Sequence, residues 1–144
     1  MSVAVDLAQG ITTAYAANGA LTAVMPAARF YYGSNPGSPA LPYGTLAIRK
    51  WKEPEYTAPA TVSSSYIAYQ TAEFTCYAGS PTDVETVVDL IRTAFHQEFT
   101  VGNSTMLEWW YDDDASQEIP EQKDGNVLYE GKLVFNATLQ RTAP

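Results

Sequence analysis

A change of hydrophobic period between residues 62 and 98 predicts a strand that runs directly into an amphipathic helix. Over 62–77, successive side chains alternate in type, and a period of two sends neighbours to opposite faces of a sheet. Ser80 then stands at a helix N-cap position, with Pro81 in the first turn and Asp83 three residues after the cap. The apolar residues that follow at helical spacing are Val84, Val87, Val88, Ile91 and Phe95. This stripe is expected to pack on the sheet.

The rest of the chain predicts a first helix, a short helical turn and four more strands. The helix is expected at 3–17, with a weak point at Gly10, and the turn at 20–25. The strands are expected at 28–32, 43–53, 104–111 and 126–141, with loops at 33–42, 54–61 and 112–125. One face of the last strand is expected to carry Val127, Tyr129, Leu133, Phe135, Ala137 and Leu139.

These elements predict an α+β fold in a single domain, residues 1–144. Strands 43–53 and 62–77 are expected to form a long antiparallel hairpin within a mostly antiparallel, mixed sheet of four to five strands. The N-terminal helix and the central amphipathic helix are expected on one face of that sheet.

Composition narrows the possible functions. The formal net charge is −8, and such a balance argues against tight binding to nucleic acid, which depends on basic side chains. The single cysteine, Cys76, alternates with Phe74 along a strand and is expected to be a buried thiol. The first residues lack the basic start of a signal peptide, and no apolar run is long enough to span a membrane. We therefore expect a soluble chain made in the cytoplasm.

Catalytic motifs are scarce. The only histidine, His96, falls near a helix end without a partner by motif, and the chain has no glycine-rich phosphate loop or Cys/His metal spacing. If the chain were a metal-assisted hydrolase, its candidate metal ligands would be an acidic run: Asp112, Asp113, Asp114, Glu118, Glu121 and Asp124. Its spacing is not that of a calcium loop, and such runs are usually solvated. We predict no cofactor and no metal.

Aromatic residues are abundant, with 10 Tyr, 3 Trp and 5 Phe. Tyr31-Tyr32 and Trp109-Trp110 are adjacent, so on a strand the two rings of each pair must point to opposite faces. The outer rings are covered either by a loop or helix of the same subunit or by a neighbouring subunit, where Tyr and Trp are enriched. The candidate interface residues are Tyr32, Trp51, Tyr56, Tyr66, Trp109 and Trp110.

Taken in order, these elements resemble the tail-terminator and tail-completion proteins of long-tailed bacteriophages, a family that includes head-to-tail joining proteins. The resemblance covers the whole chain. It is carried by the N-terminal helix with ALTAVMPAARFYYG, the SPALPY loop, the strand FTCYA leading into SPTDVETVVDLIRTAF, and the last strand YEGKLVFNATL.

The resemblance implies a non-enzymatic virion protein in the tail or neck. Such proteins assemble, typically as hexameric rings, at the end of the tail tube, between the tail-tube protein and the head-completion or connector protein. DNA would pass through the channel without specific binding, and Asp112, Asp113 and Asp114 would lie on the ring surface or lumen. The alternatives are another neck or tail-tube subunit and a small metal-assisted hydrolase that uses the acidic loop.

Overall fold

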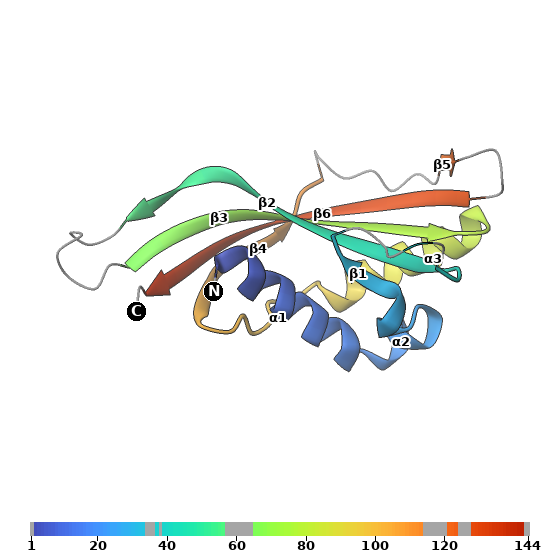
Figure 1. The fold of residues 1–144 in the computed structure, drawn as a ribbon, viewed down its shortest axis with the longest axis horizontal. Coiled ribbons are helices and arrows are strands. Elements are labelled where there is room, and N and C mark those ends of the chain that lie inside the picture. The colour runs from blue at the N-terminus through green and yellow to red at the C-terminus, as the bar shows by residue number, and fades with distance from the viewer. Residues whose placement is uncertain are drawn as a thin grey trace.

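The computed structural model describes residues 2–33, 37, 39–56, 65–113, 121–123 and 128–142. It confirms an α+β fold in which all three α-helices lie on one face of a mixed sheet (Figure 1). The strand order is β1-β2-β3-β6-β4, and β5 pairs with β6 beside this path.

The helices begin and end close to the predicted residues. Helix α1 spans Val3–Ala17 and α2 spans Gly19–Val24, while a short 3-10 helix, Ala27–Arg29, occupies the start of the expected strand 28–32. Helix α3 spans Pro81–Ala94, and the Ser80 hydroxyl accepts a hydrogen bond from the Asp83 backbone N–H, as the capping pattern predicts. It ends earlier than residue 98 because Phe95 already has non-helical backbone angles.

Three long strands form the middle of the sheet. Strand β2 (Tyr43–Tyr56) pairs antiparallel with β3 (Ser65–Ala78), which confirms the predicted hairpin, and β3 pairs antiparallel with β6 (Leu128–Thr142). The short β1 (Phe30–Tyr32) runs parallel to β2, and β4 (Ser104–Tyr111) runs antiparallel to β6. The sheet is therefore mixed, as expected.

Two boundaries differ from the sequence-based expectation. Strand β2 continues through Pro54 to Tyr56 instead of ending at residue 53. Proline is tolerated there because the hairpin is bulged between Lys52 and Glu55, and no described strand pairs with this part of β2 on its outer side. In addition, β5 (Glu121–Lys123) lies within the expected loop 112–125, where it pairs with β6.

The core lies between the helices and the sheet. Phe74 on β3 is central to it, with ring centroids 5.0 Å from Phe95, 5.6 Å from Phe135 and 5.9 Å from Phe30. The whole α3 stripe is buried, and Cys76 is also buried, with its Sγ 3.5 Å from the Gly131 carbonyl oxygen. The described residues of the last strand's predicted face point into this core as well, although Tyr129 is only partly buried.

Candidate functional site

Strands β2, β3 and β6 extend past the helix layer at one end of the molecule (Figure 1). We call residues 49–56 of β2 and 65–70 of β3 the hairpin arm. Tyr56 on this arm is the most exposed large apolar or aromatic side chain among the described residues, at 70%, and its ring centroid lies 5.7 Å from that of Tyr66. A tyrosine this exposed stabilises the isolated subunit little, so the arm is the first candidate for a contact surface.

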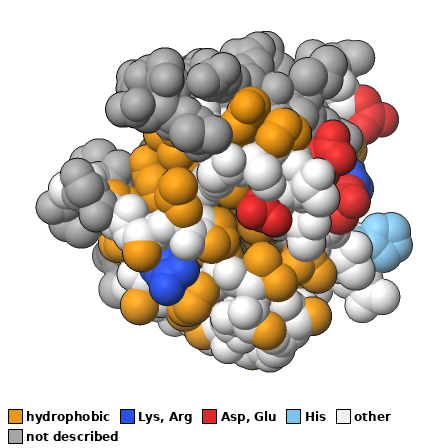
Figure 2. Space-filling view, turned by 90° about the vertical axis from the view of Figure 1, so that its right-hand side faces the viewer, with side chains coloured by type: hydrophobic (Ala, Val, Ile, Leu, Met, Phe, Trp, Pro, Cys, Tyr) orange, Lys and Arg blue, Asp and Glu red, His pale blue; other side chains and the backbone are white. Residues whose placement is uncertain are grey.

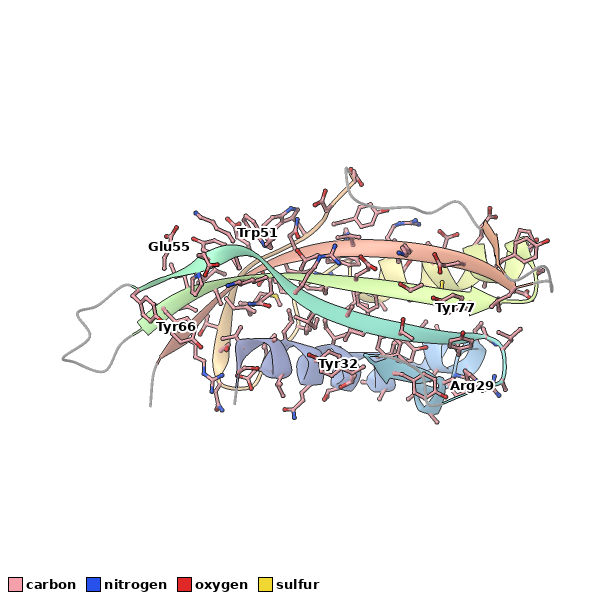
Figure 3. The ribbon with its side chains drawn as sticks, turned by 45° about the horizontal axis from the view of Figure 1, so that its top comes forward. Arg29, Tyr32, Trp51, Glu55, Tyr66 and Tyr77 are labelled. Carbon is pink, nitrogen blue, oxygen red and sulfur yellow. The ribbon has the colours of Figure 1, made fainter. Side chains whose placement is uncertain are left out.

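Trp51 lies on the sheet face opposite the helices, at the base of the arm (Figure 3), and belongs to an aromatic cluster. The Trp51 ring centroid is 5.0 Å from that of Tyr69 and 6.1 Å from that of Trp110, so the cluster joins β2, β3 and β4. Lys52 Nζ lies 4.7 Å from the centroid of the Tyr69 ring, within the range of a cation–π contact. Trp51 and Trp110 remain 44% and 37% exposed.

Polar groups continue the same face. The Asn136 side-chain amide donates to the Asp112 carboxylate at 2.8 Å and accepts from the Thr71 hydroxyl at 2.8 Å. Glu73 forms ion pairs with Arg49 at 3.0 Å and with Lys132 at 3.5 Å. These contacts connect β2, β3, β6 and the end of β4, so the face is held in a defined arrangement.

Charged residues on the outer edge of the arm pair with one another. Lys50 contacts Glu53 at 2.7 Å, and Lys52 contacts Glu55 at 2.8 Å. The hydrogen bond between Lys52 and Glu55 raises the pKa of Lys52 and lowers the pKa of Glu55. Because all four side chains are well exposed, water screens these pairs and they contribute little to stability.

The predicted interface residues do not form one patch. Tyr32 lies on β1, away from Trp51, and is 49% exposed (Figure 3). Trp109 lies on the helix side of the sheet, where it stacks on Phe135 at 4.8 Å and its Nε1–H donates to the Phe95 carbonyl oxygen at 2.9 Å. Its neighbour Trp110 lies on the opposite face, as the alternation predicts. Tyr66 also packs in part against the helix-side core.

The acidic run is only partly described. Asp112 is half-buried and holds Asn136, and Asp113 is exposed, whereas Asp114 and the side chains of Glu118, Glu121 and Asp124 lie outside the described residues. Within the part of the chain that is described, no three His, Cys, Asp or Glu side chains converge on a possible metal position.

The single histidine is exposed beyond the end of α3 and stands out beside acidic side chains (Figure 2). His96 lines a cavity of about 340 Å³ together with Arg92, Trp109 and Tyr111. Among the described residues that line this cavity, the Tyr111 phenol is the only hydroxyl or thiol group.

Sequence reasoning did not identify the Glu73 ion pairs or the Thr71–Asn136–Asp112 chain. The alternation of β3 places Thr71 and Glu73 on one face, which is a usable signal. Their partners become visible only from the register, which sets Thr71 opposite Asn136 and places Arg49 and Lys132 diagonally across from Glu73 on the neighbouring strands.

Comparison with known proteins finds a similar structure but no matching sequence family. No protein-family model matches the sequence, and no curated protein matches it. The chain is similar in structure to a chain of the virion of a native gene transfer agent particle, with a TM-score of 0.65 at 14% sequence identity. The match covers 96% of this chain and 98% of the other. At this identity the likeness shows a shared fold over essentially the whole of both chains.

Among the described helices, none has both the length and the apolar character needed to cross a membrane.

Proposed function

We propose that this chain is a structural protein of a phage or phage-like virion. The observation that carries the proposal is the end-to-end match to a virion chain, in which the shared fold covers 96% of this chain and 98% of the other. Fold alone does not determine function, so the exposed surfaces supply the second argument. An arm with a 70% exposed tyrosine and a sheet face with two exposed tryptophans suit a subunit that is covered by neighbours.

More specifically, we propose a tail-terminator role: a ring, hexameric by resemblance, that caps the tail tube and joins it to the head connector. Its partners would be further copies of itself, the tail-tube protein and the head-completion protein. Six copies at −8 each give a strongly acidic ring, and an acidic channel repels the phosphates of passing DNA instead of retaining them. Asp112, Asp113 and Asp114 are proposed for the ring surface or lumen.

The alternatives are another neck or tail-tube subunit, which would also use exposed aromatic surfaces, and a small metal-assisted hydrolase built on the acidic loop. We propose that the chain is not an enzyme. The exposed aromatic side chains of the arm, Trp51 and Tyr56, favour the structural alternatives, because tyrosine and tryptophan are enriched where neighbouring subunits meet.

Mass measurement separates these functions. The purified protein is studied by native mass spectrometry and negative-stain electron microscopy, alone and with tail tubes. A discrete ring that caps tube ends supports the terminator, and an open filament supports a tube subunit. A protein that stays monomeric with tubes and hydrolyses a phosphate ester only when magnesium is added contradicts the structural proposal.

A further inference from the structure

The N-terminal third of the chain forms a surface that is apolar and almost free of charge. Residues 7–48 contain one charged side chain, Arg29, in a chain with 8 basic and 16 acidic residues. Seven large apolar or aromatic side chains are exposed among the described residues, and three of them belong to this segment: Val24, Tyr32 and Leu41. We call these three side chains together with Arg29 the β1 surface. Charged residues are depleted in the same way at the centre of subunit interfaces.

Arg29 is a cation without a carboxylate partner in its own subunit. Its Nη1 donates to the Leu41 carbonyl oxygen at 3.2 Å, and no described acidic side chain lies within ion-pair distance of it. Arg29 and Tyr32 both lie on the side of the molecule that carries β1 (Figure 3). Because a guanidinium has five N–H donors, this one hydrogen bond leaves most of its binding capacity available. An arginine in an apolar setting is typical of a contact that another molecule completes.

A matching surface lies at the other end of the strand order, on β4. This strand exposes two more of the seven side chains, Leu107 and Trp110, and Glu108 lies between them in sequence. Glu108 is exposed, it is the only charged residue of β4, and no described basic side chain lies within ion-pair distance of it. We call Leu107, Glu108 and Trp110 the β4 surface. It combines exposed apolar area with one unpaired carboxylate, as the β1 surface combines apolar area with one unpaired guanidinium.

The other exposed carboxylates lack this setting. Among the described residues, four of them also have no ion pair but share no strand or helix with an exposed large apolar side chain: Asp83, Glu85, Glu98 and Asp113. A contact between two β1 surfaces would bury two guanidinium groups without a counter-ion, and a contact between two β4 surfaces would bury two carboxylates. Only the mixed contact covers apolar side chains on both sides and also neutralises both charges.

We propose that the β1 surface of one subunit docks on the β4 surface of a second copy of this chain, with Arg29 bound to Glu108 of the next copy. The inference rests on the proposed ring and specifies which surfaces of its neighbours meet. Because β1 and β4 are the two ends of the strand order, the contact joins two different surfaces of the subunit. Each subunit therefore keeps one surface for the next copy, and the series of contacts closes into a ring or continues as a filament.

Charge reversal tests the pairing. Arg29→Glu sets two carboxylates against each other in the contact, and Glu108→Arg sets two guanidinium groups against each other. Each variant alone is expected to need at least about tenfold more protein to assemble than the wild type. The double variant with both changes restores opposite charges and is expected to assemble within about threefold of the wild-type concentration. Strands β2, β3 and β6 separate the two positions within a subunit, so this recovery has to come from contacts between subunits.

A matched control carries Glu85→Arg on the exposed side of α3, which changes the net charge as much as Glu108→Arg does. It is expected to assemble like the wild type. Thermal unfolding of each variant establishes that it is folded. Assembly is measured by native mass spectrometry in the state where the wild type forms rings, alone or on tail tubes.

Cross-linking provides a second measurement that does not depend on charge. A variant with both Arg29→Cys and Glu108→Cys, treated with a short bismaleimide in the assembled state, is expected to give a ladder of covalent oligomers on a denaturing gel. Each single cysteine variant should give no ladder, because its new thiol has no second thiol across the contact. The wild type is the control for Cys76, which is buried and should not react.

The outcomes separate this inference from the proposed function. If the wild type forms rings but the two charge variants assemble normally, or if only one of them fails, the pairing is wrong and the ring proposal stands. If both fail and the double variant fails as well, or if rings of the double cysteine variant give no ladder, the pairing is also wrong. If the wild type forms no ring, alone or on tubes, both proposals are wrong.

Discussion

Arg141 donates from its guanidinium to the Asp6 carboxylate at 3.0 Å, and the two side chains are only 11% and 3% exposed. The pair joins the first helix to the end of the last strand across 135 positions of sequence. Ser104, at the start of β4, lies within 3.5 Å of the same carboxylate. Asp6 thus connects three parts of the chain that are distant in sequence.

Removing one member of this pair should be costly. Asp6→Ala leaves the Arg141 guanidinium buried without its partner, and such a loss destabilises a protein by about 3–5 kcal/mol. Asp89 provides a matched control, because it also pairs with an arginine, at 2.6 Å, but its side chain is 71% exposed. Asp89→Ala should change the free energy of unfolding by at most about 1 kcal/mol. Urea denaturation of both variants checks the difference, and equal effects would contradict it.

Gly131 on β6 provides a second prediction. A Cβ at this position would lie 2.6 Å from Val84 Cγ1 and 2.8 Å from Val88 Cγ2, closer than side-chain atoms can approach. Gly131→Ala should therefore force α3 away from the sheet and destabilise the subunit by about 1–3 kcal/mol. Gly19→Ala is the control, since a Cβ there meets nothing within 4 Å. The control variant should keep its stability or gain up to about 1 kcal/mol.

A double variant can show that crowding causes the loss of stability in Gly131→Ala. If the Gly131→Ala variant suffers from contact with Val84, then adding Val84→Ala should restore part of the lost stability, although Val84→Ala alone is destabilising. Purely additive losses in thermal unfolding would count against this explanation.

Local signals predicted the elements well where their causes are local. The Ser80 cap and the spacing from Val84 to Phe95 define α3 because both act within a few residues of one another. Pro54 misled the prediction of a strand end, because its tolerance depends on a bulge and on the outer side of β2, which only the sheet order reveals. Gly10 reads as a weak point in a helix, yet it lets α1 approach the chain closely, since a Cβ there would lie 2.8 Å from the Thr100 carbonyl oxygen.

The candidate surface was predictable only in part. The adjacent pair Trp109-Trp110 indicated that one ring must leave the core, and the structure identifies that ring as Trp110. The contact between Trp110 and Trp51 could not be derived from the sequence. Trp110 lies on β4 and Trp51 on β2, and strands β3 and β6 separate them in the sheet. The Asp6–Arg141 pair was likewise hidden, since a contact between the first and last elements leaves no pattern in either segment.

The buried stripe of α3 gives a third prediction. Ile91 is 1% exposed, so Ile91→Asp places an unpaired carboxylate in the core and removes apolar contacts. The variant should lose more than about 3 kcal/mol of folding free energy. Thr86→Asp is the control because Thr86 lies on the exposed side of the same helix. Circular dichroism melting compares the two, and an unchanged melting temperature for Ile91→Asp would show that the stripe does not pack as described.

Cys76 makes the fold sensitive to alkaline pH. Burial raises the pKa of its thiol to about 12, whereas the thiol of an unfolded chain ionises near pH 9. Between these values the folded protein keeps the proton that the unfolded chain loses, so the free energy of unfolding falls as pH rises, by up to about 1.4 kcal/mol per pH unit. Below about pH 9 the thiol is protonated in both states and has no such effect.

The Cys76→Ala variant isolates this contribution. Removing the thiol costs packing at every pH, so the informative quantity is the slope of unfolding free energy against pH between about 9 and 11, measured by urea denaturation. The slope should be smaller in Cys76→Ala than in the wild type. It should not vanish, because burial also raises the pKa of Tyr15 and of Tyr77 and both contribute in the same direction. Identical slopes would mean that the thiol ionises as readily in the folded protein as in the unfolded chain, and Cys76 would then be accessible to water instead of buried against Gly131.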